Sequence, residues 1–495
     1  MRKSLLVLLI FTSVNSFAQF STMFNDTLMP LGLGGYDFSC IAQDDSFYYA
    51  VGGVNNNQPL WDNMIVKFDK NFNVIKKRKF IDTIWYNANY PYNTISLNDK
   101  KLIFCTQQSK NQMSIIYGKI IALNKFTLDT LWTKTIEHPD TAYVNLPNAD
   151  VFSDLTAIKV TSDGGYILTG NYNLQCSGAN KRSFLLKIDS IGNVEWRRTY
   201  STISYLYDVE LTPNGGYIVI NKYGGTNVTV LDSVGNILWQ KKANNYIGMA
   251  TSGDLCYAGN NSFIVTTPYM YNTDTNDPLM GINVFKINQS NKQIIFDKTY
   301  ILYHNVECIG LHQDIGVETL ADGSIIVNGT LAKYGADKSG FILKLNSNGD
   351  SLWSKTYNFS HSSTARCQLN DLMLTDDGGF LGVGFYAGSS AWSAWMFKTD
   401  ENGVIGFEKT VAELVEAKVF PNPARDYTTI ELSENLTNTA ELKVYNTLGQ
   451  LVLQRPLNKG EKAIKLDLKD FESGVYFFEL IGKDGFLGSG KYVRE

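Results

Sequence analysis

DGGYILTG at residues 163–170 and FLLKIDSIGNVEWRRTY at residues 184–200 decide the fold of this chain. Asp163-Gly164-Gly165 combines a side-chain hydrogen-bond acceptor with residues that accept positive φ, as a tight turn requires. A second turn, Asp189 to Asn193, follows the apolar run FLLKI and again carries glycine late. This pattern predicts short strands joined by tight turns.

The same pattern recurs along most of the chain. Each unit has an apolar strand that ends in Asp or Asn, then a turn, then in most units an aromatic residue about seven positions on. These anchor residues lie between 43 and 65 positions apart, at Asp69, Asn124, Asp189, Asp232, Asn288, Asn346 and Asp400. Four strands per unit at this spacing are typical of β-propeller blades. We expect an all-β, seven-bladed β-propeller, with a count that can shift by one because units one and five depart from the pattern.

Ring closure explains why the strands are so apolar. A lone four-stranded sheet would expose two apolar faces, whereas blades stacked in a ring bury both. The alternatives are an open sandwich array and a β-helix, whose coils repeat faster than these units. The recurring Trp is then expected to pack between blades. The Asp-Gly-Gly and Asp-x-x-Gly-x-x-x-Trp repeats over residues 40–406 resemble those of secreted bacterial propellers of the quinoprotein and Kelch type.

The N-terminus reads as a secretory signal peptide covering residues 1–18. Arg2 and Lys3 precede the apolar run Leu5 to Thr12, and Ser16-Phe17-Ala18 supplies a small-residue cleavage site. A membrane anchor is the alternative, but the apolar run is too short to span a bilayer, and no later segment is long enough. The net charge of −4 is spread along the chain, so we expect neither nucleic acid nor an anionic membrane as a partner.

The six cysteines, at Cys40, Cys105, Cys176, Cys256, Cys308 and Cys367, are widely spaced, and no CxxC motif occurs. Export permits disulfides. Several of these cysteines lie inside apolar strands, where a cysteine often serves as a small buried hydrophobe. Both interpretations stay open at the level of the sequence.

After Gly406 the repeat stops, and residues 407–416 read as a linker. Alternating residues with turns about every ten positions predict a small antiparallel, Ig-like β-sandwich over residues 417–495. Three motifs stand out there: PNP, VYNTLGQ and SGVYFFEL, followed by a basic residue near the end. The motif positions are Pro421, Asn422, Pro423, Tyr445, Asn446, Gly449, Gln450, Ser473, Gly474, Val475, Tyr476 and Lys491.

This arrangement resembles the type A C-terminal sorting domain of the Bacteroidetes type IX secretion system. The resemblance implies that the signal peptide directs the chain through the inner membrane. The secretion machinery then recognises the C-terminal domain at the outer membrane and removes it, leaving the rest secreted or on the cell surface. An ordinary Ig-like adhesion module is the alternative. With the signal peptide and linker set apart, residues 19–406 form the expected propeller.

Motifs of catalysis are absent from the sequence, and we expect no cofactor. Neither HExxH nor GxSxG occurs. Asn272 to Asn276 alternates oxygen ligands as a calcium loop does, but Asp277 replaces the glycine and Asn283 the bidentate Glu. GFLGSGK at residues 485–491 has P-loop spacing, yet Tyr492 follows it and too little chain remains for the required helix. We expect a polar loop at the first and a coincidence at the second.

Two further features have competing interpretations. The carboxylate pairs Asp44-Asp45 and Asp376-Asp377 suit glycosidase chemistry, but they stand where a unit's first turn needs Asp, so we expect turn chemistry. The stretch from residue 85 to residue 93 is rich in rings and amides. It is either a buried strand or a ligand-binding loop that grips a sugar or a protein, and the candidate ligand-binding residues are Trp85, Tyr86, Tyr90 and Tyr92.

The sequence leaves the function between two main classes, with a purely structural surface component as a third. The first is a non-catalytic module that binds a protein or a glycan. The second is a glycan hydrolase or lyase with its site at the mouth of the propeller channel. Three or more carboxylate, His or Arg side chains gathered at that mouth would favour the enzyme, and an aromatic or mixed polar patch would favour binding.

Overall fold

In a computed structural model, the chain divides into two compact units, Met1–Val404 and Ile405–Glu495, each considered by itself. The described residues are 20–24, 35–55, 61–80, 86–88, 94–110, 115–138, 151–173, 181–222, 226–242, 253–270, 279–304, 315–332, 338–358, 366–387, 392–405, 417–436, 438–446, 450–482 and 485–495.

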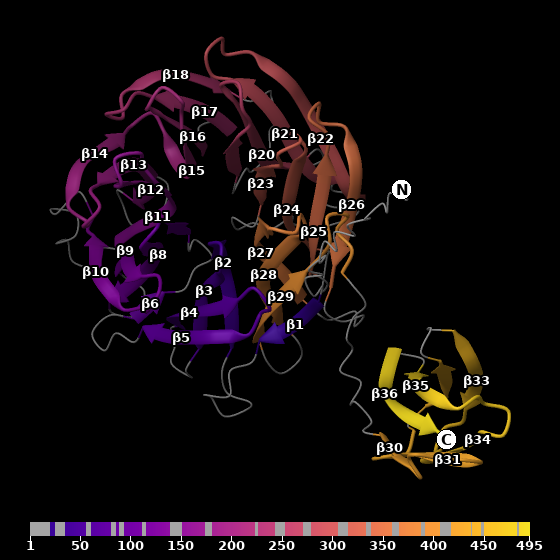
Figure 1. Cartoon of the computed structure of the whole chain (residues 1–495). Coiled ribbons are helices and arrows are strands. Elements are labelled where there is room, and N and C mark those ends of the chain that lie inside the picture. Colours follow the sequence, from indigo (N-terminus) through magenta and orange to yellow (C-terminus); the bar gives the residue numbers. More distant parts are fainter. Residues whose placement is uncertain are drawn as a thin grey trace, which may run out of the picture. The chain divides into compact units, whose positions relative to one another are not determined.

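The first unit consists of antiparallel four-strand groups, three of which are separate sheets (Figure 1). The first contains β2 (Tyr36–Gln43), β3 (Phe47–Asn55), β4 (Trp61–Asp69) and β5 (Val74–Phe80). The second contains β15 (Ser204–Leu211), β16 (Tyr217–Lys222), β17 (Thr226–Leu231) and β18 (Ile237–Lys242). The third contains β19 (Asp254–Tyr257), β20 (Ser262–Met270), β21 (Leu279–Asn288) and β22 (Ile294–His304).

Two larger sheets each join two groups through a short parallel contact, and one of these groups has five strands because β6 and β7 both pair with β8. One contains β6 (Tyr86–Ala88), β7 (Ile95–Leu97), β8 (Lys101–Lys110), β9 (Ile115–Asn124) and β10 (Thr130–Ile136), followed by β11 (Val151–Val160), β12 (Tyr166–Asn173), β13 (Lys181–Ile188) and β14 (Val194–Tyr200). The other contains β23 (Gly316–Thr319), β24 (Ile325–Ala332), β25 (Lys338–Leu345) and β26 (Ser351–Tyr357), followed by β27 (Arg366–Leu374), β28 (Phe380–Ala387), β29 (Trp392–Lys398) and β1 (Phe20–Phe24).

The second turn of the repeat is an Asx turn. In the third unit, an Asp189 carboxylate oxygen accepts the amides of Ile191 and Asn193, and Gly192 adopts a φ of +90°. The same carboxylate arrangement recurs at Asp69 and Asp232. The recurrence of Asp, Gly and Asn in the sequence therefore reflects the bonds that reverse the chain at the outer end of each group.

These turns also join neighbouring groups. A β-carbon added to Gly192 would lie 3.0 Å from the Trp132 ring, which belongs to the preceding group. The Tyr200 hydroxyl donates to the carbonyl of Gly235 in the following group at 2.7 Å, and Tyr357 bonds Gly403 in the same way at 2.8 Å. The recurring aromatic residues thus lie against the turn of the next group, as the packing interpretation predicts.

The first and last groups meet, so the arrangement is a closed, propeller-like ring (Figure 1). The Ile41 amide on β2 donates to the Asp371 carboxylate on β27 at 2.8 Å, and the Gln43 amide group donates to the Leu374 carbonyl at 2.7 Å. One buried cluster contains side chains from both groups, including Phe38 and Leu381. The outer strand of the last group is the N-terminal strand β1, which pairs antiparallel with β29 from Phe20↔Lys398 to Phe24↔Ala394.

Buried lysines in the third strand of several groups are neutralised by the Asp of the first turn. Lys398 is fully buried and forms an ion pair with Asp377 at 2.7 Å. Lys187 pairs with Asp163 at 2.8 Å and also with Glu195 at 3.1 Å. Asp44 accepts the amides of its own turn, as the turn interpretation of the carboxylate pairs predicts.

Asp377→Asn is expected to destabilise the first unit by on the order of 3–5 kcal/mol, because Lys398 would keep a buried charge without its carboxylate. Asp163→Asn is the matched control and should cost less, since Lys187 retains Glu195. Burial acts to raise the pKa of Asp377, but hydrogen bonds from Lys398, Thr375 and Gly379 lower it overall. This stabilisation should therefore be complete above about pH 4 and fade as the pH falls further. Urea unfolding of both variants at pH 7 and pH 3 checks the prediction; equal losses at pH 7 would contradict it.

The second unit contains two small antiparallel sheets around one core (Figure 1). One contains β30 (Ala417–Phe420), β31 (Tyr427–Leu432) and β34 (Ala463–Asp467). The other contains β32 (Ala440–Tyr445), β33 (Leu451–Leu457), β35 (Gly474–Gly482) and β36 (Gly485–Arg494). Buried side chains from both sheets, such as Ile430, Leu442 and Phe478, belong to one hydrophobic cluster.

Candidate functional site

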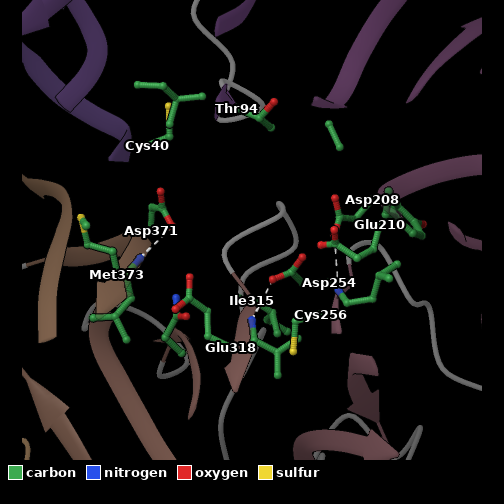
Figure 2. A pocket seen from close by; sticks show the side chains of 18 of the residues that line it. Cys40, Thr94, Asp208, Glu210, Asp254, Cys256, Ile315, Glu318, Asp371 and Met373 are labelled. Carbon is green, nitrogen blue, oxygen red and sulfur yellow. Dashed lines mark hydrogen bonds between the residues drawn. The ribbon is translucent and has the colours of Figure 1, made fainter. Parts of the chain in front are cut away.

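A cavity of about 490 Å³ lies where the first strands of the groups meet in the first unit (Figure 2). A volume of this size suits a small molecule. Its wall contains six charged side chains: one lysine, Lys159, and five carboxylates, Asp208, Glu210, Asp254, Glu318 and Asp371. They come from β11, β15, β19, β23 and β27, so strands far apart in the sequence build one acidic site.

Three of these carboxylates tie adjacent groups together. Asp208, Asp254 and Asp371 occupy equivalent positions on the first strands of their groups. Each lies three residues before the last residue of that strand that pairs with the second strand. Each accepts an amide from the inner strand of the next group, from Leu255 at 3.4 Å, Val317 at 2.7 Å and Ile41 at 2.8 Å, respectively. The repeated position therefore has a structural role in holding the ring.

On one side of the cavity, Asp208, Glu210 and Asp254 lie near one another (Figure 2), and the charges of all three act on Lys159. Lys159 pairs with Glu210 at 3.0 Å, and its side chain is 37% exposed because it faces the cavity. Burial acts to lower the pKa of Lys159, but the surrounding carboxylates raise it overall, so it stays charged. Burial raises the pKa of both Asp208 and Asp254, and each acid acts on the pKa of the other. Such a pair holds one proton between two acids.

On the other side, Glu318 and Asp371 lie near one another (Figure 2). Burial raises the pKa of Asp371 to about 7, and repulsion from Glu318 contributes. Burial likewise raises the pKa of Glu318. In the described ranges, neither acid has a Lys, Arg or His partner within ion-pair distance.

The described part of the chain contains no group of three His, Cys, Asp or Glu side chains placed to hold a metal ion. Cys40 and Cys256 line the cavity, and burial raises the pKa of both thiols well above the ordinary value, so they are neutral. The four described cysteines, Cys40, Cys105, Cys256 and Cys367, form no disulfide with one another; Cys176 and Cys308 lie outside the described residues.

The candidate ligand loop lies mostly beyond what the structure describes. Tyr86 lies in β6, opposite Ser109 of β8, whereas Trp85, Tyr90 and Tyr92 are outside the described residues, so their role stays a prediction. The Asn272–Asn276 segment is also outside them. Asn283 lies in β21, where its side-chain amide donates to Asp297 at 2.7 Å.

Sequence reasoning missed the acidic cavity. Its one local signal is alternation of acids in an apolar strand, as in Asp208-Val209-Glu210, where both acids lie on one face. Glu318 and Asp371 give no such signal, since they come together only when two groups pack side by side.

The sorting-motif positions have mixed structural roles. Asn422 accepts the Val493 amide at 2.9 Å, which ties the PNP segment to β36. Asn446 and Gln450 close a turn through side-chain and backbone bonds, while Gly449 lies outside the described residues. Tyr476 packs on Tyr492, with ring centroids 5.5 Å apart. The exposed motif positions include Ser473, Gly474 and Lys491.

Several solved structures resemble the chain. The Neurospora crassa Pan2 WD40 domain is 13% identical, covers 77% of this chain and 94% of its own, and has a TM-score of 0.45. A polysaccharide lyase, PL25 ulvan lyase, is 12% identical, with coverage of 76% and 93% and a TM-score of 0.43. A Dyadobacter fermentans protein of unknown function is 9% identical, with coverage of 68% and 97% and a TM-score of 0.43. Among curated proteins, none matches this chain.

The second unit has a clear family match. Residues 418–489 match the family described as a secretion system C-terminal sorting domain, in agreement with the three motifs and their order. No helix among the described residues is long and apolar enough to cross a membrane. The C-terminal unit is therefore a type IX sorting domain, which marks this propeller-like protein for transport across the outer membrane, to be secreted or attached to the cell surface.

Proposed function

We propose that residues 19–406 form a seven-bladed β-propeller that acts outside the cell as a non-catalytic binding module for a glycan or a protein. In this proposal the linker is 407–416, the C-terminal domain is an Ig-like sandwich over residues 417–495, and its partner is the type IX machinery. Three separate sheets and two double sheets among the described residues support the blade count.

The observation that carries the binding role is the engagement of the cavity carboxylates. Five carboxylates line the cavity, which meets the carboxylate count set above for an enzyme. Three of them, however, hold the next group through its backbone amides. A fourth, Glu210, is paired with Lys159 at 3.0 Å. These contacts favour a polar recognition site over paired acid and base catalysts.

A glycan array, probed with the chain from residue 19 onward and combined with turnover assays on the polysaccharides that bind, tests this role. We expect retention of a ligand with no change in its chain length. Release of shortened or unsaturated products would establish the alternative, a secreted hydrolase or lyase. Binding that survives in Glu318→Gln but is lost on substitution of Tyr86 would place the ligand on the aromatic loop instead of in the cavity.

A further inference from the structure

Glu318 and Asp371 form the part of the acidic cavity that has no cationic partner among the described residues. The opposite side is balanced by Lys159, which bonds Glu210 and lies near Asp208 and Asp254. Glu318 and Asp371 are too far from Lys159 for an ion pair, although its charge still acts on both. The cavity therefore has excess negative charge on the side formed by β23 and β27.

Two buried polar side chains that line the same cavity have no hydrogen-bond partner in the part of the chain that the structure describes. Asn328 on β24 lines the cavity and is 3% exposed, yet its Nδ2 atom has no hydrogen-bond partner among the described residues. Ser39 on β2 also lines the cavity, is 4% exposed, and has an unpartnered Oγ in the same part of the chain. Buried polar groups are normally paired, because an unpaired one costs on the order of 1–3 kcal/mol.

Glycine at position 316 makes room for Asn328. Gly316 stands opposite Asn328, as Asp254 stands opposite Thr266 in the preceding group. A β-carbon at position 316 would lie 2.4 Å from Asn328 Oδ1. The β23–β24 hairpin thus has no Asp where Asp208, Asp254 and Asp371 stand in other groups, and the carboxamide occupies that space.

From this arrangement we propose that the cavity binds a small organic cation that also carries hydroxyl or carbonyl oxygens, with its ammonium group at Glu318 and Asp371. The inference rests on the binding role proposed above. The carboxylates supply two charged acceptors, Asn328 Nδ2 supplies a donor for a ligand oxygen, and Ser39 can donate or accept.

A bare metal ion fits these groups less well. Among the described residues, no three acid, Cys or His side chains are placed to coordinate one. The unpartnered Nδ2 of Asn328 is a donor, which repels a cation and needs an acceptor. A molecule with both an ammonium group and oxygen atoms satisfies both requirements, and the cavity volume of about 490 Å³ accommodates it.

The probe is glucosamine, which combines an ammonium group with hydroxyls, and N-acetylglucosamine is its uncharged counterpart. Isothermal titration of the chain from residue 19 to residue 495 is expected to give a Kd on the order of a millimolar for glucosamine, by the usual efficiency of small ligands. N-acetylglucosamine should bind at least ~10-fold more weakly, the effect of losing one charged hydrogen bond. Calcium chloride is titrated alongside.

Glu318→Gln should weaken glucosamine binding by ~10-fold or more, since it removes the charge but keeps the size and shape of the side chain. Asn328→Ala removes the unpartnered donor and should weaken binding ~3–10-fold. Glu401→Gln, at an exposed outer turn, is the matched control and should leave affinity unchanged. Melting temperatures of all four proteins verify that each variant is folded.

Affinity should also rise with pH. Asp371 is faced by Glu318 on β23, by Cys40 on β2 and, at longer range, by Lys159 on β11. A cation favours the ionised acids, so binding releases protons and strengthens as the pH rises toward about 7, where the amine of glucosamine is still protonated. Equal binding of the two sugars, binding unaffected by Glu318→Gln, or calcium binding that displaces glucosamine would each overturn the proposal. A positive glycan array with no such charge selectivity would refute this inference and leave the binding role standing.

Discussion

A chain that lacks residues 20–24 is expected to lose on the order of 5–10 kcal/mol of unfolding free energy in its first unit. The five residues of β1 pair with β29 over their whole length. Their backbone hydrogen bonds contribute about 0.5–1.5 kcal/mol each. Without β1, the buried side chains Trp395 and Phe397 would lie on an edge strand, and each exposed side chain costs about 1.5–3 kcal/mol.

Loss of β1 should also promote aggregation, because an unpaired edge strand can associate with other chains. Thermal unfolding by near-ultraviolet circular dichroism, together with light scattering, compares three chains: residues 19–495, 25–495 and 19–404. The third lacks the C-terminal unit and serves as the control, since the strand that completes the last sheet is N-terminal. We expect early melting and aggregation of the second only. Partial recovery on adding a peptide of residues 19–26 would locate the defect at β29. Equal melting of all three chains would mean that β1 does not close the ring.

The sequence was a good guide to the strands and turns because their signals are local. Asp189, Gly192 and Asn193 make bonds within one turn, so their order in the chain already specifies the geometry. The aromatic residue seven positions after the anchor was also interpretable, since four groups repeat the same contact with the glycine of the next turn, through Trp132, Trp196, Phe296 and Trp353. The fifth unit has the weakest motif and carries Phe296 as its aromatic residue. It still forms strands β20 to β22.

The site could not be predicted in the same way. Asp371 lies 53 positions beyond Glu318, and Ile41, which donates to Asp371, is 330 positions away in the sequence. Such neighbours exist only after the ring closes, and a lone Asp in an apolar strand looks the same whether it holds a neighbouring strand or faces a ligand. The contribution of the N-terminal strand to the last sheet was missed for the same reason, because its partner β29 is more than 360 residues away.

Removal of residues 405–495 is expected to abolish export and leave the first unit folded. The match of residues 418–489 to the sorting domain makes this unit the part that the secretion machinery recognises. In a bacterium with a type IX system, the truncated chain should accumulate in the periplasm, whereas the full chain appears outside the cell or on its surface. Cell fractionation and protease accessibility measure the distribution. Export of the truncated chain at the level of the full one would contradict the assignment.

Two point variants separate recognition from folding within this unit. Tyr476→Ala removes a buried ring that stacks on Tyr492 and a hydroxyl that bonds the Glu472 carbonyl at 2.8 Å, so stability should fall by on the order of 3–5 kcal/mol and export with it. Gly474 is exposed, and a β-carbon there would meet nothing within 4 Å. Gly474→Lys should therefore leave the melting temperature unchanged and still reduce export, because the motif surface itself is altered. Ser433→Lys, exposed and outside the motifs, is the matched control. If both lysine variants were exported normally, the exposed part of the SGVY motif would have no part in recognition, and the motif would matter only through the core that Tyr476 completes.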